Sequence, residues 1–163
     1  MCSGAAVGKK HGPNRLSNYL ETHDTVMQQF VSRGFVLSNE LAFWPYGEGL
    51  FVITGDVRCL GRITLRVAKV LEVVGGDRRN PLVQTVAYSY NASLEGMGNI
   101  LRYDSPHSEQ HRPTHHVHRY DVLNGDLEGT VEEVANDAWP TIGDVLTELQ
   151  EFYYANFDEL PQG

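Results

Sequence analysis

The segment Ile63-Thr-Leu-Arg-Val-Ala-Lys-Val-Leu-Glu-Val-Val74 decides the fold of this chain. Its apolar and polar residues alternate, and it is rich in the aliphatic and β-branched residues that favour strands. Residues 75–81, Gly-Gly-Asp-Arg-Arg-Asn-Pro, have the composition of a turn. The alternation then resumes from Leu82 to Tyr90. Because no helical stretch separates the two runs, they predict an antiparallel hairpin.

Further strand-like runs lie on both sides of this hairpin and are joined to it by short connections. They comprise residues 35–37, 41–44, 50–53, 100–104 and 115–120. Successive strands without intervening helices predict an antiparallel sheet. Residues 124–137 are acidic, and we expect a solvated loop there, with a protein-contact segment over 126–137 as the alternative.

Two amphipathic segments enclose the strands. The first has apolar residues at three- and four-residue spacing from Leu16 to Val31, and Gly34 suits a left-handed cap. The second begins at Thr141, with Asp144 in the position of a capping box. The sequence therefore predicts an α+β fold, in which an N-terminal and a C-terminal helix pack on an antiparallel sheet of about four to six strands. We expect one domain over residues 15–163, preceded by a flexible arm over 1–14.

Composition restricts the function. The chain has 163 residues, and 13 Lys and Arg oppose 21 Asp and Glu, which gives a formal net charge of −8. This balance argues against a protein that coats nucleic acid by neutralising many phosphates. Two cysteines are too few for a disulfide scaffold. No signal peptide or membrane-spanning run is recognisable, so we expect a cytoplasmic protein without a membrane partner.

Histidines gather in one short part of the sequence. Five of the seven lie within twelve residues, at His107, His111, His115, His116 and His118. Arg102 and Asp104 precede this group closely. Such clustering makes the segment the candidate functional site.

Three interpretations of the histidines are open. In a strand, His116 and His118 point to the same face, and with His107 and nearby Asp104 they could bind Zn²⁺ or another divalent transition metal. Without a metal, His116 and His118 could act as base and acid on a phosphodiester. Arg102 or Arg119 would then neutralise the developing charge. In the third interpretation, the histidines only pack and form hydrogen bonds at a polar strand edge.

The same residues carry a resemblance to a known family. Arg102-Tyr-Asp-Ser-Pro-His107, followed by His115-His-Val-His118, resembles the Arg-Tyr-Asp-Asn-x-Pro-His and His-His-x-His segments of the toxin TumE family. The strand ending in Tyr88-Ser-Tyr90 and the helix over 141–149 are also similar, so the resemblance covers roughly residues 50–154. The chain departs from the family pattern at Leu60, at Ala68-Lys69 and at Ser108.

The resemblance implies the toxin of a toxin–antitoxin module, with a small helix-turn-helix antitoxin as its partner. The family positions that this chain retains are Arg102, Asp104, His107, His115, His116 and His118. From the histidines we infer a histidine-dependent endoribonuclease that needs no cofactor. The alternatives are a metal-dependent hydrolase with His107, His116 and His118 as ligands, or a non-catalytic binding protein with a histidine-rich surface.

Overall fold

A computed structural model describes residues 11–106 and 114–160. Its helices are α1 (Leu16–Ser32) and α2 (Ile142–Ala155), and short 3-10 turns occupy Leu60–Arg62, Val122–Asn124 and Phe157–Glu159. Its strands are β1 (Asn14–Arg15), β2 (Val36–Asn39), β3 (Ala42–Pro45), β4 (Leu50–Cys59), β5 (Ile63–Gly76), β6 (Pro81–Leu94), β7 (Gly98–Asp104), β8 (His115–Arg119) and β9 (Thr130–Val134).

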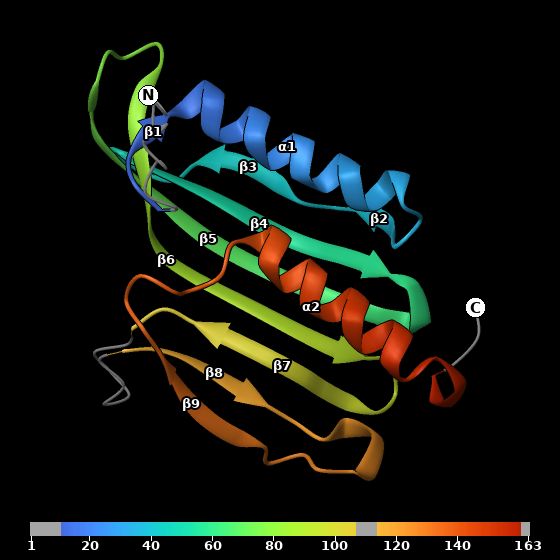
Figure 1. The fold of residues 1–163 in the computed structure, drawn as a ribbon. Helices are drawn as coiled ribbons and strands as arrows, with labels where there is room; N and C mark the ends of the chain where they lie inside the picture. Colours follow the sequence, from blue (N-terminus) through green and yellow to red (C-terminus); the bar gives the residue numbers. More distant parts are fainter. Residues whose placement is uncertain (1–10, 107–113, 161–163) are drawn as a thin grey trace, which may run out of the picture.

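All these strands belong to one antiparallel sheet, and both helices cover the same face of it (Figure 1). The strand order is β2-β4-β5-β6-β7-β8-β9, while β1 pairs with β6 and β3 pairs with β4. From β4 to β9, each strand therefore lies beside the next one in the sequence. The predicted α+β fold, with an N-terminal and a C-terminal helix on an antiparallel sheet, is confirmed.

The predicted hairpin is the centre of the sheet. Strands β5 and β6 pair from Ile63 with Leu94 to Gly76 with Pro81, and the register shifts between Val70 and Leu71 and between Val73 and Gly75. Residues at every second position of β5, among them Leu65 and Val67, are fully buried beneath the helices. Burial of each such side chain contributes roughly 1.5–3 kcal/mol, so the hairpin and the two helices hold each other in place.

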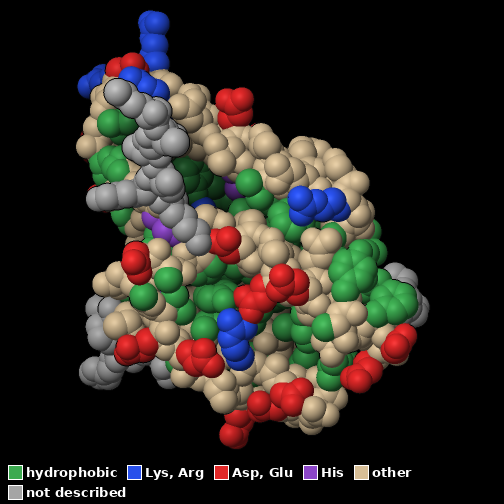
Figure 2. Space-filling model, in the orientation of Figure 1, with side chains coloured by type: hydrophobic (Ala, Val, Ile, Leu, Met, Phe, Trp, Pro, Cys, Tyr) green, Lys and Arg blue, Asp and Glu red, His purple; other side chains and the backbone are tan. Residues whose placement is uncertain are grey.

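Helix α2 begins as the sequence predicts. The Thr141 hydroxyl accepts a hydrogen bond from the Asp144 amide at 3.2 Å, and the Asp144 carboxylate accepts one from the Thr141 amide at 2.9 Å. This capping box satisfies two amide groups that the helix itself cannot. Leu146 and Leu149 of α2 are completely buried against the sheet. On this covered side, the surface is hollowed between α1 and α2 (Figure 2).

Within the described residues, the sheet is already larger than expected, because it has nine strands instead of about four to six. The predicted loop over 124–137 is wrong for Thr130–Val134, which form β9 and pair with β8. Strand β9 lies at the edge of the sheet and its side chains are mostly exposed. Its pairing rests on backbone hydrogen bonds, so an apolar alternation is not required there.

The predicted arm over 1–14 differs from the structure at its C-terminal end, while residues 1–10 lie outside the described residues. Asn14 pairs with Val83 of β6. The His11 ring stacks on Trp139, and its Nε2 forms a hydrogen bond of 2.7 Å with the Trp139 carbonyl oxygen. Asn14 and His11 are therefore packed against β6 and Trp139, respectively. Within 11–106 and 114–160, no helix is long and apolar enough to cross a membrane.

Candidate functional site

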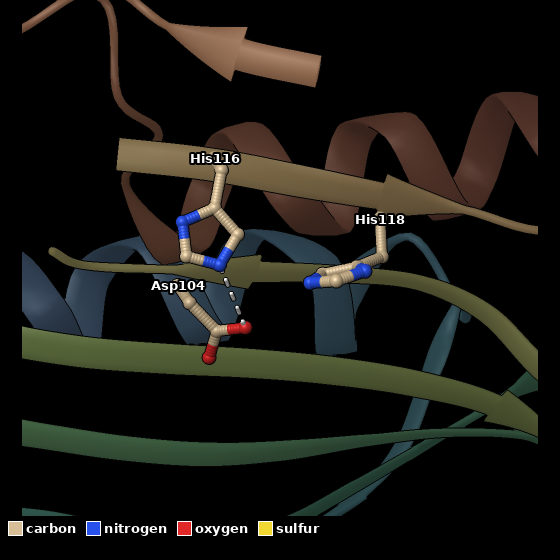
Figure 3. Close-up of side chains that lie close together, drawn as sticks. All are labelled: Asp104, His116 and His118. Carbon is tan, nitrogen blue, oxygen red and sulfur yellow. Dashed lines mark ion pairs between the residues drawn. The ribbon is translucent and has the colours of Figure 1, made fainter. Parts of the chain in front are cut away.

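Three residues that can bind a metal meet at the ends of two neighbouring strands. Asp104 is the last residue of β7 and lies directly opposite His116 of β8, and Arg102 lies opposite His118. Side chains alternate along a strand, so these four side chains share one face of the sheet. Tyr103, on the other face, bonds to Glu148 of α2. The cluster of Asp104, His116 and His118 therefore lies on the face opposite the helices (Figure 3).

The spacing within this cluster approaches that of a metal site. One ligand atom from each of Asp104, His116 and His118 lies within 4.8 Å of the other two. His116 Nε2 and Asp104 Oδ2 are 3.7 Å apart. Ligand atoms in a tetrahedral site with bonds of about 2.0–2.2 Å are separated by about 3.4 Å. The cluster is therefore somewhat wider than a closed tetrahedral site, and His118 is its partly exposed member.

The orientation of His116 favours a cation in this cluster. Its Nδ1 lies 2.9 Å from the Thr114 carbonyl oxygen, and a carbonyl only accepts, so Nδ1 carries a proton. In the neutral ring, the lone pair of Nε2 then faces the Asp104 carboxylate. A metal ion or a proton between the two atoms removes this repulsion. Histidine ligands of metals are commonly oriented by such a bond from their second nitrogen.

Asp104 also holds an arginine. Its Oδ2 lies 2.8 Å from Arg102 Nε, and the Asp104 side chain is buried whereas that of Arg102 is 45% exposed. An ionised donor and a carboxylate at this distance form a strong hydrogen bond. Because Arg102 is bound through Nε, its two terminal nitrogens can reach a phosphate outside the sheet.

His115 does not join this cluster, although the family resemblance includes it. It points to the helix-covered face, where its Nδ1 lies 2.8 Å from the Tyr88 hydroxyl. Its ring stacks with the rings of Tyr88 and Trp139. Burial, and secondly the nearby His116, lower the pKa of His115. The alternation along β8 explains the separation of His115 from His116 and His118.

Arg119, one of the two predicted phosphate contacts, also faces the helices. It forms an ion pair with Glu148 of α2, and its second terminal nitrogen donates to the Tyr103 hydroxyl at 3.0 Å. Tyr103 in turn donates to Glu148 at 2.8 Å. This group of three residues fastens α2 to β7 and β8. Of the two arginines that the sequence offered, Arg119 therefore lies on the other face from His116 and His118, and Arg102 lies on the same face as they do.

His107, the third histidine of the predicted metal site, lies outside the described residues. Among the described residues, Asp104 takes the place of a third ligand. Glu133 was missed, because it falls in the segment predicted to be a loop. In the structure it lies in β9 directly opposite His116, on the same face of the sheet. The sequence signal for it was the short run Thr130-Val-Glu-Glu-Val134, which carries little apolar alternation.

The cluster ends a row of polar residues that crosses the open face. In register from β5 to β8, the row contains Arg66, Asn91, Arg102 and His118. Neighbouring strands lie about 4.8 Å apart, so the row runs straight across the sheet. Arg66 is exposed and pairs with Asp56 of β4 at 3.1 Å. The open face therefore presents two arginines beside the cluster.

Comparison with known proteins does not assign this site. No protein-family model, no curated protein and no solved structure matches the chain.

Proposed function

We propose that this protein is a metal-dependent phosphodiesterase that cleaves RNA and serves as the toxin of a toxin–antitoxin module. The observation that carries the proposal is the convergence of Asp104, His116 and His118, with Arg102 bound to the carboxylate. The resemblance of residues 102–107 and 115–118 to the TumE family supports the toxin role. The metal-dependent activity is argued from the geometry alone.

The geometry favours a metal over a metal-free pair of histidines. A general base must reach the substrate proton with one ring nitrogen. His116 is only 3% exposed, its Nδ1 bonds to the Thr114 carbonyl oxygen and its Nε2 faces Asp104. Both nitrogens are thus directed at protein groups, as in a metal ligand, and His116 has little access to a substrate.

The surroundings of the cluster suit a phosphodiester. Arg102 pairs with Asp104 through Nε and is 45% exposed, and Arg66 lies two strands further along the same row. Guanidinium groups bind phosphate oxygens in a bidentate manner. The net charge of −8 gives RNA no long-range attraction, so binding depends on these few local contacts.

The chemistry needs no nucleophile from the protein. In RNA, the 2′-oxygen attacks the adjacent phosphorus and forms a 2′,3′-cyclic phosphate, and the 2′-hydroxyl proton passes to solvent. The bond to the 5′-oxygen breaks, and that oxygen takes up a proton from solvent. A divalent metal held by Asp104, His116 and His118 would polarise a phosphate oxygen and supply a bound water of lowered pKa. Arg102 would neutralise charge on the remaining phosphate oxygen.

The proposed partner is a helix-turn-helix antitoxin. DNA-binding proteins carry clusters of Lys and Arg, whereas this chain has a net charge of −8. Opposite charges raise the rate of association and align the two proteins.

The test compares growth and RNA integrity after the protein is induced alone. We expect the native chain to stop growth and to fragment RNA, and Asp104→Asn and His118→Gln to do neither. His115→Asn is the matched control, because His115 is on the same strand but faces the helices, and Asn can keep the bond to Tyr88. This variant should remain toxic.

A chelator separates the mechanisms. Purified protein should lose RNA cleavage in EDTA and regain it with Zn²⁺ or Mn²⁺. Cleavage that persists in EDTA would favour the metal-free histidine mechanism instead. If induction neither stops growth nor fragments RNA, the protein is a non-catalytic binding protein and the proposal is overturned.

A further inference from the structure

A cavity separate from the metal cluster lies on the other face of the sheet, between α1 and α2. Its volume is about 600 Å³. The walls come from Tyr19, His23 and Val26 of α1, Lys69 of β5, Thr85 of β6 and the first turn of α2. In Figure 2, histidine and lysine or arginine side chains are visible within the hollow between the helices. A volume of this size is typical of sites for small organic molecules.

Lys69 gives the cavity a buried positive charge. It stands in the series of β5 residues that faces the helices, between Val67 and Leu71, and is only 7% exposed. Its ammonium group donates to the Tyr19 hydroxyl and lies 5.0 Å from the centre of the Tyr19 ring. A buried charge is costly unless an opposite charge compensates it.

The part of the chain that the structure describes places no opposite charge in the wall of the cavity. Among the described residues, no aspartate or glutamate lines it, and none pairs with Lys69. This is unusual in a chain with a net charge of −8. Besides Lys69, the ionisable side chains in the described wall are His11, Tyr19 and His23, none of which is a carboxylate. An anion is therefore the complement that the cavity lacks.

The N-terminus of helix α2 carries partial positive charge, part of which the Asp144 carboxylate of the capping box offsets. This N-terminus, at Thr141, Ile142 and Gly143, forms one wall of the cavity. The positive end of a helix dipole attracts an anion. Gly143 allows the two helices to approach closely, because a Cβ atom there would lie 3.0 Å from Val26 Cγ1. The helix end is thus held against α1 beside the apolar part of the cavity.

We propose that this cavity binds a small organic carboxylate with an apolar body. The carboxylate would pair with Lys69 and accept hydrogen bonds from the Tyr19 and Thr85 hydroxyls, which are 3.4 Å apart. The apolar body would lie against Val26, Ile142 and the Tyr19 ring. The volume exceeds what an inorganic ion needs, and the single lysine suits one monoanionic group. This site is independent of the metal cluster, which lies across the sheet.

The test is calorimetric titration of the purified full chain with sodium hexanoate. Acetate supplies the charged group alone, and hexanol supplies the apolar body alone. We expect hexanoate to bind and to raise the melting temperature, and the two partial probes to bind much more weakly. Lys69→Met keeps the volume of the side chain but removes the charge. It should weaken hexanoate binding about tenfold or more, because a hydrogen bond to a charged group is lost.

Arg66→Met is the matched control. Arg66 is on the same strand, three residues earlier, and its exposed side chain is on the opposite face. This variant should bind hexanoate as the native chain does. Should Lys69→Met fail to fold, Tyr19→Phe, which removes the hydroxyl that contacts Lys69, should weaken binding instead.

Three results would overturn the proposal: no binding of hexanoate to the native chain, equal binding by Lys69→Met, or binding of hexanol as strong as that of hexanoate. None of these results bears on RNA cleavage. Conversely, loss of the metal site leaves this prediction intact.

Discussion

The three histidines of β8 show how much depends on the direction of single side chains. His116 and His118 face Asp104, whereas His115 faces Tyr88 and Trp139. The period of two in a strand predicted the first pair from the sequence. The separation of His115 follows from the same rule, although the family motif places all three together.

The choice between the two arginines could not be made from the sequence. Arg102 and Arg119 both flank the histidines in the sequence, Arg119 in the strand that carries them and Arg102 in the strand before it. Which one serves the site depends on the pairing of β7 with β8 and on Glu148 of α2, which binds Arg119. These contacts join residues that are far apart in the sequence.

The pKa of a single buried histidine, His23, leads to a prediction about stability. It lies on α1, and burial, followed by the charge of Lys69, lowers its pKa from the ordinary value of 6.5, while Asp24 partly offsets the shift. The folded state therefore holds the neutral ring and the unfolded state binds the proton more readily. The contribution to stability is present above about pH 6.5 and is lost as the pH falls below it.

The measurement is urea unfolding at pH 7.5 and at pH 5.5. We expect the native chain to lose stability on acidification, and His23→Gln to lose less of it. An unchanged loss in His23→Gln would show that His23 does not contribute to acid sensitivity.

Among the elements, those with strong periodic patterns could be predicted. The β5–β6 hairpin has alternation in both strands and a Gly- and Asn-containing turn, and α2 has a capping box with a buried apolar stripe. Strand β9 could not be predicted, because its side chains are mostly exposed and the neighbours Glu132 and Glu133 put a carboxylate on each face, so it lacks the apolar alternation that distinguishes strands from loops. Its omission also hid Glu133 beside His116.

The N-cap of helix α2 leads to a prediction about stability. Thr141→Ala removes the hydroxyl that caps the helix, and loss of such a cap costs about 1 kcal/mol. Thr147→Ala is a matched control in the same helix, because the Thr147 hydroxyl bonds only back to the Gly143 carbonyl. In urea unfolding, Thr141→Ala should be less stable by about this amount, and Thr147→Ala should be nearly unchanged. Equal effects of the two substitutions would argue against the cap.

For the whole molecule, the single sheet separates two environments. The covered face holds the apolar core, the aromatic stack of His115 and the cavity at Lys69. The open face holds the row of polar residues from Arg66 to His118 and the cluster of Asp104, His116 and His118. A sequence pattern of period two predicts that two faces exist. The same pattern does not show where two helices leave space between them, so the cavity could not be predicted from the sequence.

The most direct test of the proposed metal centre is calorimetric titration of the purified protein with Zn²⁺. We predict one tight Zn²⁺ site per chain in the native protein and in His115→Asn. Asp104→Asn and His118→Gln should each bind at least about tenfold more weakly, because each loses a ligand. Absence of Zn²⁺ binding in the native protein, or equal binding in all four proteins, would contradict a metal centre at Asp104, His116 and His118.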